Sequence, residues 1–84
     1  MLFNGVDIMD WREKKFNEIF ENVCAGIEWR MKNDQSFSVK HLEESLKSLY
    51  IQEGNNWDGR GEVAEVTLTA TIAAFEHMLA EINN

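Results

Sequence analysis

The chain contains no proline, and three of its five glycines fall within the eight residues 54–61. Proline and glycine are the residues that most often interrupt regular secondary structure, so the segments on either side of this cluster can form long continuous elements. Apolar residues recur every three or four positions along these segments. This is the period of an amphipathic α-helix, and it predicts an all-α protein.

The spacing predicts three helices, at about residues 10–33, 38–53 and 61–82, within a single domain that covers residues 1–84. The core stripes are Phe16, Phe20, Val23, Ile27 and Met31 in the first helix, Val39, Leu42, Leu46 and Leu49 in the second, and Ala64, Leu68, Ile72, Phe75, Leu79 and Ile82 in the third. The predicted fold is a three-helix bundle with a short N-terminal arm and a Gly/Asn-rich loop before the last helix.

Polar residues and glycine mark the predicted helix ends. The polar run 33–36 ends the first helix, and the hydroxyl of Ser38 is expected to cap the free amides of the second. Gly54 is expected to take a left-handed conformation after the second helix, and Asp58 to cap the third. Residues 65–72 also alternate polar and apolar, as in a strand, but the helical stripe continues to Ile82, which favours the helix.

The third predicted helix is apolar on two sides. Opposite its core stripe lie small residues that permit close helix packing, namely Val63, Val66, Ala70, Ala73 and Ala74, with His77 at the end. Either this helix is central in the bundle, or its alanine face meets a second copy, for which a two-fold dimer is the commonest arrangement.

Trp11 and Trp29 are separated by five full helical turns and fall opposite the core stripe of the first helix. Exposed tryptophans are over-represented at the centres of protein interfaces, so these two are predicted to form an interaction surface. The alternative is that the N-terminal arm or the glycine-rich loop covers them within one molecule.

Charge and cysteine content limit the other classes of partner. The net charge is −7, and residues 34–84 carry nine acids against three bases, which disfavours direct binding to nucleic acid. The longest uncharged segment, 66–75, has ten residues, against the ~20 of a membrane helix. With one cysteine, Cys24, and no opening that resembles a signal peptide, we expect a cytoplasmic protein without membrane contact.

The residues that carry most enzyme chemistry are scattered. Cys24, His41 and His77 lie far apart without the spacing of metal ligands, and the chain has neither a phosphate-binding loop nor a nucleophile motif. His77 is expected to be packed or salt-bridged. The sequence therefore predicts a protein that is not an enzyme and that has no metal and no cofactor.

The glycine-rich loop offers an alternative function. Gly59, Arg60 and Gly61 place backbone amides and a guanidinium at the start of the third helix, where they could bind an anion beside Trp57. This arrangement would suit a small-ligand or anion-binding regulatory protein.

Three segments carry a resemblance to a known group of proteins: Leu49-Tyr50-Ile51, Gly59-Arg60-Gly61-Glu62, and Ala70-Thr71-Ile72-Ala73-Ala74-Phe75-Glu76. The region 46–81 resembles small acidic helical proteins of unknown function from anaerobic Gram-positive bacteria. The resemblance implies that the loop and the third helix form a recurring unit, and it implies no catalytic or binding residue.

Our leading hypothesis is a non-enzymatic protein–protein interaction module, which forms a homodimer or binds another protein. Its predicted surface comprises Trp11, Trp29, Val66, Ala70, Ala73 and His77. A third possibility is an acidic mimic of nucleic acid that occupies the binding site of another protein, suggested by the charge of residues 34–84.

Overall fold

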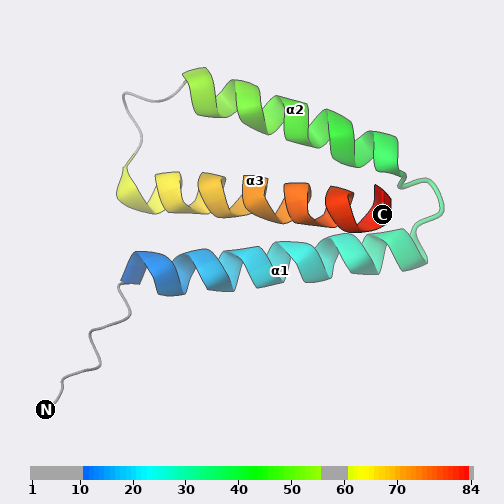
Figure 1. The fold of residues 1–84 in the computed structure, drawn as a ribbon, viewed down its shortest axis with the longest axis horizontal. Coiled ribbons are helices and arrows are strands. Elements are labelled where there is room, and N and C mark those ends of the chain that lie inside the picture. Colours follow the sequence, from blue (N-terminus) through cyan, green and yellow to red (C-terminus); the bar gives the residue numbers. More distant parts are fainter. Residues whose placement is uncertain (1–10, 56–60, 84) are drawn as a thin grey trace, which may run out of the picture.

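The computed structural model describes residues 11–55 and 61–83, which form three α-helices. They are α1 (Trp11–Asn33), α2 (Val39–Asn55) and α3 (Glu62–Asn83), shown in Figure 1. The described residues contain no strand, and the alternating segment 65–72 lies inside α3. The prediction of an all-α, three-helix fold is confirmed.

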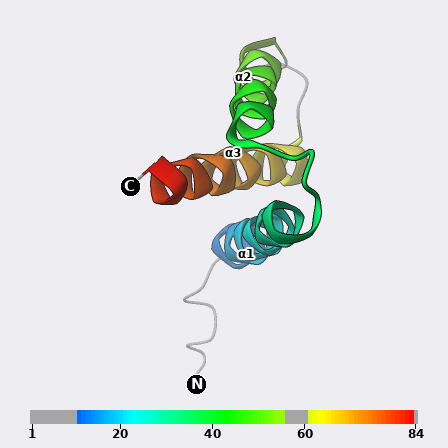
Figure 2. The same cartoon turned by 90° about the vertical axis from the view of Figure 1, so that its right-hand side faces the viewer.

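The last helix in the sequence lies in the middle of the structure. α3 packs against α1 on one side and α2 on the other, and within the described residues no Cα atom of α1 lies within 8 Å of one in α2. Figures 1 and 2 show the same order from two directions, with α1 and α3 parallel and α2 antiparallel to both. The bundle is therefore an open layer of three helices.

The two apolar sides of α3 explain this order. On the side of α2, Leu68 and Ile72 pack with Leu46 in one cluster of buried residues. On the side of α1, Ala70 and Ala74 are completely buried, and the thiol of Cys24 lies 3.9 Å from the carbonyl oxygen of Ala74. Small side chains on this side let α1 approach closely, so the alanine face is covered within the chain.

A second cluster joins all three helices near the C-terminal end of α3. It is formed by Ile27 of α1, Leu42 of α2 and Met78 of α3, and Leu42 is fully buried. Half-buried hydrophobic residues surround these three: Val23, Cys24, Met31, Phe37, Phe75, Leu79 and Ile82. The core is small, because the buried hydrophobic residues of the described chain number eight.

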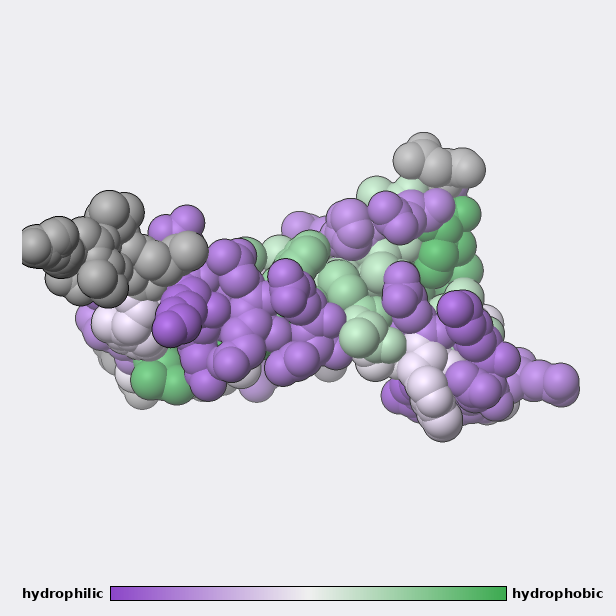
Figure 3. Space-filling model, turned by 90° about the horizontal axis from the view of Figure 1, so that it is seen from below, coloured by the Kyte–Doolittle hydropathy of each residue, from purple (hydrophilic) through white to green (hydrophobic). Residues whose placement is uncertain are grey.

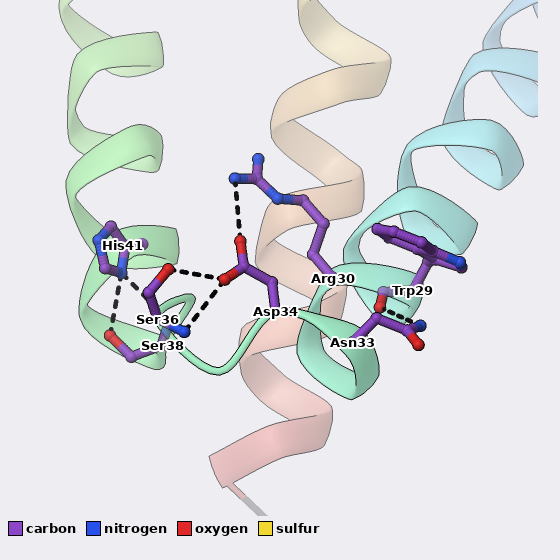
Figure 4. A network of polar contacts seen from close by, with 7 residues as sticks. All are labelled: Trp29, Arg30, Asn33, Asp34, Ser36, Ser38 and His41. Carbon is purple, nitrogen blue, oxygen red and sulfur yellow. Dashed lines mark hydrogen bonds and ion pairs between the residues drawn. The ribbon is translucent and has the colours of Figure 1, made fainter.

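The connection between α1 and α2 holds a local polar network (Figure 4). α1 ends at Asn33, as predicted, and the Asn33 side-chain amide donates to the carbonyl of Trp29 at 2.8 Å. The Asp34 carboxylate accepts from the hydroxyl of Ser36 at 2.6 Å and from its backbone N–H at 3.1 Å. These two hydrogen bonds, with the Arg30 guanidinium 3.9 Å away, lower the pKa of Asp34.

Ser38 begins α2 but not in the predicted way. Its carbonyl accepts the N–H groups of His41 and Leu42, which identifies it as the N-cap residue. The Nδ1 atom of His41 lies 3.1 Å from both the Ser38 hydroxyl and the Ser38 backbone N–H (Figure 4). The hydroxyl therefore pairs with the imidazole, and His41 occupies the position that glutamate takes in a capping box.

The predicted ends around the glycine-rich loop are also corrected. α2 continues to Asn55, so Gly54 lies inside the helix, and no described glycine has a positive φ. A glycine in a helix is less favourable than an alanine by only about 1 kcal/mol of helix stability, which the remaining helical residues can offset. At the start of α3 the carbonyl of Gly61 accepts the N–H of Glu65 at 2.9 Å, so Gly61 takes the N-cap position expected for Asp58. Asp58 itself lies outside the described residues.

By length and composition alone, one helix of the described chain, Glu62–Ile82, is apolar enough to cross a membrane. This helix is α3, and 33% of its most apolar window is buried by the rest of the protein. A core helix that packs on two sides has the same composition. The absence of a membrane span thus stays a prediction.

Candidate interaction surfaces

The outer side of α1 carries the two predicted tryptophans. Trp11 is 46% exposed and Trp29 is 64% exposed. The Arg12 guanidinium carbon lies 5.8 Å from the centre of the Trp11 ring, within the range of a cation–π contact. Large aromatic surfaces in water are costly, so the helix retains apolar surface that its own core does not use.

Lysines border Trp11. A shallow hollow of about 200 Å³ on the surface of α1 is lined by Trp11, Lys14, Lys15 and Glu18. Lys15 forms an ion pair with Glu18 at 3.4 Å, one turn along the helix. We call Trp11 with Lys14 and Lys15 the basic knob.

An acidic groove lies between the N-terminal halves of α1 and α3. It has a volume of about 520 Å³ and is lined by Arg12, Glu13, Phe16, Glu62, Glu65, Val66 and Thr69. Arg12 pairs with Glu62 across the groove at 3.1 Å. Among residues 11–55 and 61–83, no cation lies within 4 Å of the carboxylates of Glu13 or Glu65. The groove therefore combines apolar side chains with an excess of negative charge.

Sequence reasoning did not find this groove, because it assigned Phe16 to the core and placed Glu62 and Glu65 with the helix dipole. Phe16 is in fact half-buried. A signal was present in the sequence, since Glu62, Glu65 and Thr69 have helical spacing and lie on one side of α3. The sequence did not show which side of α3 packs against α1.

The remaining residues of the predicted surface face α1. Ala70 is buried, and Val66 and Ala73 are half-buried. His77 is exposed, with its ring 5.5 Å from that of Phe20 and its Nε2 atom 3.6 Å from Glu81. His77 is thus both packed and close to an acid, as expected, and this face is partly used inside the molecule.

Figure 3 views the molecule from the side of α1. Hydrophilic residues cover most of the visible helix, and a hydrophobic area lies toward the end that holds the α1–α2 connection. At the opposite end of α2 and α3, three further hydrophobic side chains are exposed: Tyr50, Ile51 and Val63. A second hollow of about 450 Å³ lies between α2 and α3, with Leu49 and Phe75 in its lining.

The anion-binding prediction falls almost entirely outside the described residues. Trp57, Gly59 and Arg60 belong to the segment 56–60, and only Gly61 is described. The structure places Gly61 at the start of α3, beside Glu62.

Within the described ranges, no group of three His, Cys, Asp or Glu side chains lies close enough to hold a metal ion. Burial in an apolar environment, followed by the charges of Glu28 and Glu81, raises the pKa of the Cys24 thiol. A raised pKa disfavours the reactive thiolate.

Comparison with protein-family models, curated proteins and solved structures finds no match to this chain. The resemblance to small acidic helical bacterial proteins stays a prediction.

Proposed function

We propose that this protein is a non-enzymatic interaction module that associates with a second copy of itself. The observation that carries the proposal is the exposure of Trp11 and Trp29 on α1 in a fold whose central helix is already covered on both sides. The exposed aromatic surface lies on an outer helix, where a partner has free access.

The size of the core supports an association. A chain of 84 residues buries only about 60% of the surface that its unfolded form exposes, so its stability margin is narrow. The described residues form an open layer of three helices with eight buried hydrophobic residues, and within them α1 and α2 do not pack on each other's backbones. Such a layer has less shared core than a closed bundle. Burial of tryptophan at a contact would add apolar area that the monomer lacks.

Sedimentation equilibrium of the full chain over a wide concentration range tests this proposal. We expect a reversible dimer for the natural protein and a shift toward monomer for the double variant Trp11→Ala/Trp29→Ala. Ile51→Ala is the matched control, because Ile51 is 56% exposed but lies on α2. A chain that stays monomeric at every concentration would refute self-association.

A further inference from the structure

The basic knob and the acidic groove lie at the same end of the molecule. The groove is bounded by residues 12–16 of α1 and 62–69 of α3, and the knob occupies residues 11–15 of α1. One feature is the half-exposed ring of Trp11 beside two lysines, and the other is a hollow that contains apolar side chains and acids. The two lysines and the excess of carboxylates are complementary in charge.

The knob cannot fill the groove of its own molecule. Trp11 and Phe16 are five residues apart, which places them about 140° apart around the axis of one helix. The Trp11 ring has the guanidinium carbon of Arg12 5.8 Å from its centre. Any knob that enters the groove must therefore come from another copy.

The charges of the groove favour a cationic occupant. Three carboxylates, those of Glu13, Glu62 and Glu65, stand against one guanidinium in its lining. The guanidinium of Arg12 is already within hydrogen-bond distance of Glu62. Lysines that approach Glu13 and Glu65 would gain ion pairs that these acids lack within the described part of the chain.

We propose that Trp11 of one copy inserts into the acidic groove of a second copy, with Lys14 and Lys15 facing the second copy's Glu13 and Glu65. This inference rests on the proposed self-association and names its contact. A volume of about 520 Å³ is within the range of pockets that enclose small ligands, and Phe16 and Val66 supply an apolar wall for the indole.

A two-fold dimer is the smallest closed assembly that uses this contact. Each copy carries one knob and one groove, so a two-fold pair fills both grooves at once and leaves neither knob in water. The lysine–glutamate contacts would fix the register of the two copies, because like charges meet in other registers.

Single substitutions separate the two tryptophans. Trp11→Ala is expected to raise the dissociation constant of the dimer by about 30-fold or more, which is the effect of removing an interface hot spot. Trp29→Ala, at a more exposed position on the same helix, should leave the dissociation constant within a few-fold of the natural value. Circular dichroism confirms that each variant keeps its helices.

Charge reversal gives a test in which binding can be restored as well as lost. Lys14→Glu/Lys15→Glu in one chain and Glu13→Lys/Glu65→Lys in another should each abolish self-association. Mixed in equal amounts, the two variants should form a heterodimer, since acidic knob meets basic groove at one contact and the natural charges meet at the other. Sedimentation velocity measures all three samples.

Two results would overturn this contact even if the protein self-associates. In the first, Trp29→Ala weakens the dimer and Trp11→Ala does not. In the second, the two charge variants do not form a heterodimer when they are mixed. The second result is also expected if residues 1–10 of the same chain fill the groove. A natural protein that remains monomeric would overturn both this contact and the proposed function.

Discussion

The phenolic hydroxyl of Tyr50 in α2 donates a hydrogen bond to the Glu76 carboxylate in α3, across 26 positions of sequence. This bond, then partial desolvation and the charges of Glu76 and Glu53, raise the pKa of Tyr50 above its ordinary value. The protonated phenol is the form that can donate, so ionisation breaks the bond.

Replacement of the acceptor should therefore lower the pKa of Tyr50. In Glu76→Gln we expect the phenol to titrate closer to its ordinary pKa of about 10. The chain has one tyrosine, so phenolate absorbance reports this residue alone. Glu43→Gln, on the same helix as Tyr50 but absent from the causes of its shift, is the control and should leave the pKa unchanged.

The same shift links Tyr50 to the pH dependence of stability. Because its pKa is higher in the folded state, its contribution is present below the unfolded pKa and is lost as the pH rises through the folded pKa. The free energy of unfolding should fall less steeply over this alkaline range in Glu76→Gln than in the natural protein. Equal slopes would show that the bond does not form in solution.

Leu42 should be the most sensitive position of α2. Leu42→Ala leaves a cavity beside Ile27 and Met78 and should reduce the free energy of unfolding by roughly 2–5 kcal/mol. Urea unfolding followed by circular dichroism measures the change. The exposed residue Lys47 is the control on the same helix, and Lys47→Ala should change stability by no more than about 0.5 kcal/mol.

The packing between α1 and α3 can be tested by enlarging an alanine. Ala70 has no exposed surface, so Ala70→Leu should force the helices apart at a cost of about 1–3 kcal/mol. Ala80→Leu makes the same change at an exposed position of α3 and should be nearly neutral in thermal unfolding. Equal stability of the two variants would contradict the placement of the alanine face against α1.

Cys24 should react slowly with alkylating reagents. Burial first, and then the nearby acids Glu28 and Glu81, raise the pKa of its thiol, so the folded protein has less thiolate at neutral pH than the unfolded chain. As the pH is raised, the alkylation rate should begin to increase at a higher pH in native buffer than in denaturant. Glu28→Gln should accelerate the native reaction slightly, because burial is the larger cause. A native rate equal to the denatured rate would show an accessible, ordinary thiol.

Helix number and type could be predicted because helical periodicity is a local property. The stripes of Phe16 to Met31 and of Leu68 to Ile82 are visible in the sequence, and so are the two apolar sides of α3. The exposure of Trp11 and Trp29 follows from the same helical spacing, which places both residues opposite the core stripe of α1. Local polar residues likewise marked the end of α1 at Asn33.

The sequence could not predict how the helices are arranged around one another. Arg12 meets Glu62 across 50 positions and Tyr50 meets Glu76 across 26, and no local pattern links such pairs. The acidic groove depends on the side of α3 that α1 covers. Glycine permits a left-handed conformation, which the sequence predicted for Gly54 at the end of α2. The prediction was wrong, because the end of α2 does not use a positive φ at this residue.

The central place of α3 has a consequence for biosynthesis. α3 follows both neighbours in the chain, so a ribosome completes α1 and α2 before it makes the surface on which each of them packs. Until then their apolar stripes have no native partner, and such transiently exposed stripes are prone to aggregate or to require a chaperone. The packing of α1 and α2 therefore waits until α3 itself has been translated.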